Sequence, residues 1–201
     1  MERLVCYSLS RVLSAVLCLR AAGCPVSRLR AEDVLYIRAE RTAAWCATVR
    51  ASVVADICLE RHAGAVCDDA AALLQLMLRA DPASLKDRAA AATPRAAHSR
   101  ALLRAARLLA ERTWHGVSAA RDLLEFVLWG PPEGEARIAA MGGEGSREAA
   151  FRAWLDVARC RALARLVLEP GACDGEVADQ VGFLCRVTDS TLIEVTKHLF
   201  Q

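Results

Sequence analysis

Apolar residues recur every three to four positions along most of the chain, which is the spacing of amphipathic helices. Read together with Gly, Pro and capping residues, this pattern predicts about eight helices. The first two span residues 2–22 and about 31 to about 61. Asp68 or Asp69 is expected to cap the third, which Pro82 ends, and Thr93-Pro94 opens the fourth, which ends at Trp114–Gly116. Ser118 is the expected cap of a helix over 119–129, Ser146 caps one that ends before Glu169–Gly171, and two short helices over about 175–186 and 190–200 follow. No alternating β pattern is long enough to predict a sheet.

The predicted helix over residues 119–129 is apolar on nearly every side, because Leu123, Leu124, Phe126, Val127 and Leu128 follow one another closely. Such a helix is usually buried at the centre of a domain. We therefore expect an all-α protein: one globular bundle of about seven to nine helices around a central hydrophobic helix.

Two clusters of helix-breaking residues stand out, Gly130–Gly134 and Gly142–Gly145. Gly-Pro and Gly-Gly runs interrupt helices, so residues 130–146 are predicted to be an internal linker. A chain of 201 residues is about one domain long. We expect a single helical domain over residues 1–201, with residues 1–30 as an N-terminal extension helix.

Composition narrows the functional class. The net charge is about +2, and the basic residues are spread along the chain without the patch that nucleic-acid binding requires. The apolar run from Val12 to Leu19 is too short to cross a bilayer, so no stable membrane anchor is expected. Nine Cys, without a C-x-x-C pair, favour reduced thiols in the cytoplasm.

The sequence carries no motif of a phosphate loop, a dinucleotide fold or a zinc protease. Cys46, Cys58, His62 and Cys67 could supply zinc ligands, but the close ligand pairs of structural zinc sites are lacking. Reduced core cysteines are the better interpretation. We expect no enzyme activity, no catalytic residue, no metal and no cofactor.

The stretch from His115 to Gly130 resembles the first homology motif of the Bcl (B-cell lymphoma two) apoptosis-regulator family. Gly116, Val117 and Arg121 stand at the spacing of that motif, and the hydrophobic helix follows. Leu76–Asp81 is similar to the core of the third homology motif. The resemblance implies a groove for partner helices, formed by Leu108, Leu109, Gly116, Val117, Arg121 and Leu124.

In that family the Arg pairs with an Asp of the incoming amphipathic helix, so Arg121 would be the charge partner. The 24 Arg and two Lys, with partly lost motifs, are similar to viral members of the family. The implied function is a viral modulator of host apoptosis or innate (NF-kappa-B-type) signalling, acting in the host cytoplasm. The alternative is a death-fold adaptor or decoy with two bundles that divide near residues 93–98.

Overall fold

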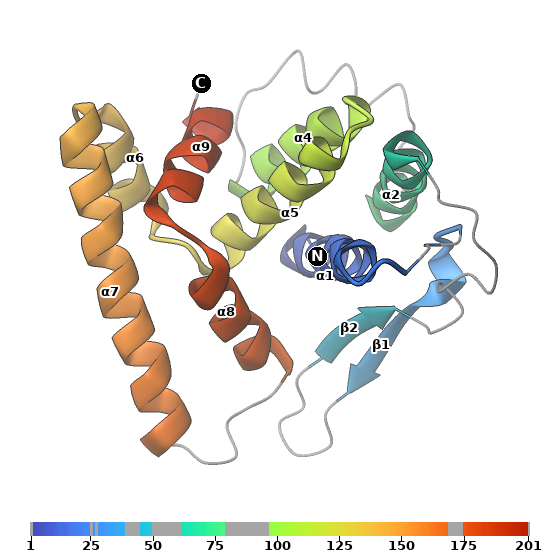
Figure 1. Ribbon diagram of the computed structural model, residues 1–201, viewed down its shortest axis with the longest axis horizontal. Helices are drawn as coiled ribbons and strands as arrows, with labels where there is room; N and C mark the ends of the chain where they lie inside the picture. Colours follow the sequence, from blue (N-terminus) through green and yellow to red (C-terminus); the bar gives the residue numbers. More distant parts are fainter. Residues whose placement is uncertain are drawn as a thin grey trace. The chain divides into compact units, whose positions relative to one another are not determined.

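The computed structural model describes residues 2–24, 26, 28–38, 45–49, 62–78, 97–168 and 175–200. This part of the chain contains eight α-helices, one short 3₁₀-helix and one two-stranded sheet (Figure 1). The all-α prediction is confirmed. The chain divides into two compact units: residues 1–35 with 47–128, and residues 36–46 with 129–201.

Unit 1 is built from α1, α2, α4 and most of α5. Their bounds are Glu2–Ala21, Ala63–Leu78, Ala97–Ala110 and Trp114–Trp129. α1 packs against both α2 and α4, and α2 packs against α4. One buried apolar cluster joins α1, α2 and the segment after α1 through Val12, Val16, Val26, Leu29, Val66 and Leu73. Burial of this apolar surface is the main force that holds unit 1 together.

α1 begins and ends almost where the periodicity predicts. Among the described residues it is the one helix that has the length and apolar composition of a membrane span, and half of that stretch is buried inside the structure. Its polar residues are satisfied internally: Ser10 donates to the Tyr7 carbonyl, and Ser14 donates to the buried carboxylate of Glu125. The buried core helix of a folded protein meets the same length and composition criteria.

The helix predicted from about Ala31 to about Arg61 is wrong at its described residues. Residues 31–33 form the 3₁₀-helix η1, and β1 (Val34–Arg38) pairs with β2 (Trp45–Val49). Figure 1 shows the two strands side by side and running in opposite directions. Both strands are rich in β-branched and aromatic residues, which favour strands. The longer apolar periodicity masked this local preference.

Two predicted helix starts are also misplaced. Asp68 and Asp69 do not cap α2 but lie inside it, since α2 begins at Ala63. The Asp69 carboxylate instead accepts the backbone N–H of Leu29 at 2.9 Å, which ties the segment before η1 to α2. Likewise Ser118 lies inside α5, where Thr113 takes the capping role: its hydroxyl accepts the N–H of Gly116 at 2.9 Å.

Unit 2 contains the last residue of α5 and four further helices. These are α6 (Glu133–Met141), α7 (Glu144–Leu168), α8 (Gly175–Arg186) and α9 (Asp189–Phe200). α7 packs against the other three, and α6 also packs against α9. The bounds of α8 and α9 match the prediction to within one residue, and α7 begins two residues early.

The predicted linker over residues 130–146 is not irregular throughout, because α6 occupies most of it. Its Ala136 is fully buried, so one face contributes to the core of unit 2. Arg147 closes the turn between α6 and α7 by donating to the carbonyls of Ala140 and Gly142. The single-domain prediction stays a prediction, because two compact units do not decide whether each folds by itself.

Candidate functional site

The residues of the predicted groove lie in the core of unit 1. Leu108, Leu109, Val117 and Leu124 are each at most 4% exposed. They belong to α4 and α5, and they do not line an open surface. A partner helix could reach them only if this core opened. The groove stays a prediction, and in this structure its apolar residues serve packing.

Gly116 is needed where α5 begins because the backbone of α4 passes close by. A Cβ placed on Gly116 would lie 2.3 Å from the carbonyl oxygen of Leu108, nearer than any real contact allows. The Arg121 side chain is only 13% exposed; it pairs with the neighbouring Asp122 at 2.8 Å and also donates to the Ser118 hydroxyl. The predicted charge partner is therefore already occupied by groups of its own helix.

Several large apolar side chains of α7 are exposed. We call this area the α7 outer surface: Val157, Cys160, Leu163, Ala164, Val167 and Leu168. Val157, Leu163, Val167 and Leu168 are 50%, 62%, 74% and 76% exposed. Phe151 and Leu155 of the same helix are buried, as predicted for its inner face. α7 therefore presents apolar side chains on two sides, whereas a surface helix normally has one apolar face.

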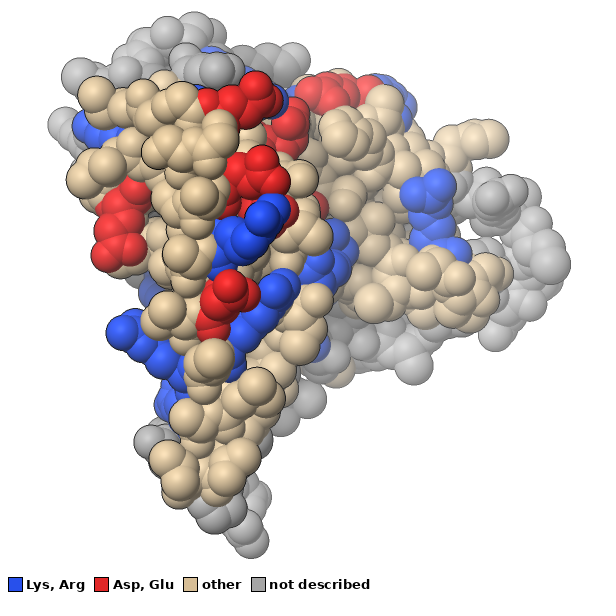
Figure 2. Space-filling model, turned by 60° about the vertical axis from the view of Figure 1, so that its left-hand side comes forward, with Lys and Arg blue, Asp and Glu red and all other residues tan. Residues whose placement is uncertain are grey.

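Figure 2 shows uncharged surface at the lower end of the view, where α7 ends, and charged side chains above it. Single exposed apolar residues are common on proteins, but a contiguous exposed apolar patch is typical of an interaction surface. The sequence carried a signal for this surface: apolar residues at 157, 160, 164 and 168 recur at helical spacing beside the predicted inner stripe.

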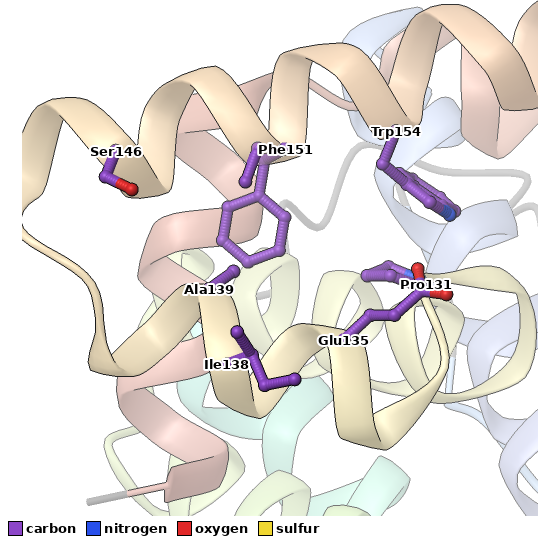
Figure 3. Close-up of a pocket in the computed structure, with 8 residues that line it drawn as sticks. Pro131, Glu135, Ile138, Ala139, Ser146, Phe151 and Trp154 are labelled. Atoms are coloured by element: carbon purple, nitrogen blue, oxygen red, sulfur yellow. The ribbon is translucent and has the colours of Figure 1, made fainter.

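A cavity of about 310 Å³ lies between α6 and α7. It is lined by Pro131, Glu135, Ile138, Ala139, Ser146, Ala150, Phe151 and Trp154. Figure 3 shows Phe151 and Trp154 projecting from α7 toward α6. At its rim Ile138 is 74% exposed, although it is a large apolar side chain. The lining is therefore apolar and aromatic, with one carboxylate.

That carboxylate, Glu135, has no ion pair or hydrogen bond with any described residue. Two Arg residues that are close to the lining residues in sequence are engaged. Arg137 pairs with Glu133 and also lies over the ring of Phe200, and Arg147 is bonded to backbone carbonyls. An uncompensated negative charge thus lies beside an apolar cavity, which favours a ligand that is apolar and cationic.

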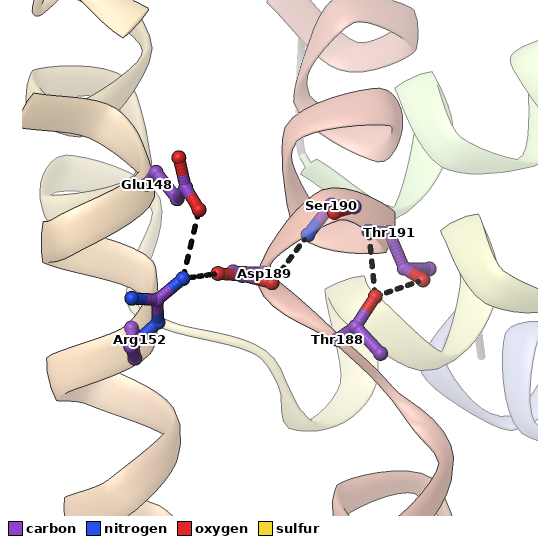
Figure 4. A network of polar contacts seen from close by, with 6 residues as sticks. All are labelled: Glu148, Arg152, Thr188, Asp189, Ser190 and Thr191. Carbon is purple, nitrogen blue, oxygen red and sulfur yellow. Dashed lines mark hydrogen bonds and ion pairs between the residues drawn. The ribbon is translucent and has the colours of Figure 1, made fainter. Parts of the chain in front are cut away.

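A polar network fixes the start of α9 against α7 (Figure 4). The Arg152 guanidinium contacts Glu148 at 2.7 Å and Asp189 at 2.8 Å. The hydrogen bond from Arg152 holds the pKa of Asp189 below its ordinary value. The Thr188 hydroxyl caps α9 by accepting the N–H of Thr191. This network joins α7 to the start of α9.

The described cysteines divide by burial. Cys6 and Cys67 are buried, while Cys18, Cys160 and Cys185 are exposed. Burial raises the pKa of the Cys6 thiol to about 12. Among the described residues no group of three or more His, Cys, Asp or Glu could hold a metal ion. Cys58, one of the residues considered as a zinc ligand, lies outside them.

No protein-family model matches the chain, and no curated protein matches it either. The fold is similar to that of a solved structure described as the crystal structure of the pseudokinase PEAK1 (Sugen Kinase 269). The TM-score is 0.74 and the identity 20%, over 99% of this chain and 60% of that chain. This chain therefore spans somewhat more than half of that pseudokinase chain, and the likeness shows a shared fold.

Proposed function

We propose that the chain is a non-enzymatic protein-interaction module that binds an amphipathic helix of a partner along the α7 outer surface. The observation that carries this proposal is the exposure of four large apolar side chains on one helix. A partner helix packed there would bury apolar surface, and each Å² of buried apolar surface stabilises the complex by about 25 cal/mol. Helices recognise such surfaces through apolar anchors at i, i+3/i+4 and i+7.

The likeness to a pseudokinase shows a shared fold, and the proposed binding role rests on the exposed apolar residues of α7. The finer prediction, a Bcl-like viral modulator of host apoptosis or innate signalling, remains a proposal resting on the sequence resemblance alone. So does its place in the host cytoplasm. The death-fold alternative predicts a division near residues 93–98, whereas the two units divide between Leu128 and Trp129.

Calorimetry with a panel of amphipathic helical peptides, including death-promoting helices, tests two versions of the binding proposal. In one the peptide binds along the α7 outer surface, and in the other it binds in the predicted groove beside Arg121. Binding along α7 should be lost in Val167→Glu, because this change places a charge within the apolar surface, at a residue that is 74% exposed. It should persist in Leu4→Glu, which places the same charge at an apolar residue of α1 in unit 1 that is 47% exposed. Circular dichroism confirms that each variant is folded.

The groove version makes a different prediction with the same panel. Binding should then weaken in Arg121→Ala and persist in Val167→Glu. A panel in which no peptide binds, or in which Val167→Glu binds as wild type does, contradicts the proposal for α7. The two versions can thus be told apart in one set of titrations.

A further inference from the structure

We infer that the α6–α7 cavity is a second docking site, which takes an apolar side chain of a short basic helix from a partner protein. Its volume of about 310 Å³ lies at the lower end for ligand pockets. A cavity of this size suits one or two side chains better than a whole cofactor. The cavity shares no lining residue with the α7 outer surface.

The apolar part of the site is open to an incoming residue. Phe151 forms the floor and is 1% exposed, while Ile138 stands at the rim and is 74% exposed. Trp154 lies at the other end, beside Pro131 (Figure 3). An aromatic floor with an exposed aliphatic rim is the arrangement in which an inserted side chain loses most of its contact with water.

The charge pattern selects the partner. Glu135 lines the cavity without a described partner, and Glu144 at the start of α7 likewise has none. The basic groups nearby are already engaged with carboxylates, an aromatic ring or carbonyls. An Arg or Lys next to the inserted residue would meet Glu135, whereas an acidic helix would be repelled. A basic helix is therefore favoured over a neutral or acidic one.

The test uses two short alanine-based helical peptides with identical Leu positions, one carrying Arg and the other Glu on the flanking positions. Binding is followed in ¹⁵N–¹H spectra through the Trp154 indole N–H, assigned with Trp154→Phe. The Arg peptide should shift this resonance, and the Glu peptide should not. Glu135→Gln should lower the affinity for the Arg peptide about two- to fivefold. Ile138→Asp should lower this affinity about tenfold.

The matched control is Glu111→Gln, which removes an exposed carboxylate from unit 1 and should leave the affinity unchanged. Val167→Glu should also leave it unchanged, so failure here is distinguishable from failure of the proposal for the α7 outer surface. Equal binding of both peptides, undetectable binding of the Arg peptide, or binding that leaves the Trp154 resonance in place would overturn the inference.

Discussion

Replacing Gly116 by Ala tests whether this motif residue is needed for packing. The added Cβ would lie 2.3 Å from the Leu108 carbonyl oxygen, about 1 Å inside ordinary contact. The obstacle is backbone, so the start of α5 must move away from α4. Overpacking of this kind lowers the free energy of unfolding by about 1–3 kcal/mol. The higher helix propensity of Ala offsets up to about 1 kcal/mol of this loss. We expect a net loss of about 1–2 kcal/mol.

Gly134→Ala is the matched control. Gly134 also lies near the start of a helix, but nothing lies within 4 Å of its added Cβ. This variant should be more stable than wild type by about 0.5–1 kcal/mol. In thermal melts followed by circular dichroism, Gly116→Ala should lower Tm by about 2–8 °C, while Gly134→Ala should raise it. If Gly116→Ala melts at or above the wild-type Tm, the close approach of α4 and α5 is refuted.

Two further predictions follow from ionisable groups. Because Arg152 lowers the pKa of Asp189 in the folded state, this pair stabilises the fold above the unfolded pKa of about 3.9 and less as pH falls through the lower folded value. Asp189→Asn should therefore be less stable than wild type at pH 7, with the difference narrowing below about pH 4; urea titrations giving one constant difference would contradict this. Under native conditions iodoacetamide should modify the exposed Cys160 at least about a hundredfold faster than Cys6, whose buried thiol has a raised pKa. Equal labelling rates by mass spectrometry would show that the Cys6 site is open.

Helices whose apolar stripe is regular and whose ends carry strong signals were predictable. α8 and α9 end at residues that break or cap a helix, and α1 ends before Gly23, whose φ of +69° suits a glycine. The strands were not predictable by periodicity, because five-residue runs such as Val34–Arg38 are too short to outweigh the longer helical pattern around them. α6 was missed because Gly and Pro on both sides indicate a linker, while the pairing of α6 with α7 and α9 stabilises it.

The candidate sites were likewise predictable only in part. The sequence predicted a buried helix over residues 119–129, and Leu123, Leu124 and Phe126 of α5 are buried, while Val127 and Leu128 are half-buried. It could not show whether Leu108 and Leu109 line a groove or fill a core, because both have the same apolar pattern. The α6–α7 cavity was not predictable either, since it brings Glu135 and Ile138 beside Phe151 and Trp154 only after two helices pack.

Composition and periodicity by themselves determined that this protein is helical, which residues are apolar enough for a core, and where most helices end. These are local properties, set by propensity, capping and the spacing of side chains along one helix. Only the tertiary structure decided which apolar faces are covered. The outer face of α7 and the inner face of α5 look alike in sequence, but burial depends on which neighbour packs against a face, and that choice is made by the whole fold.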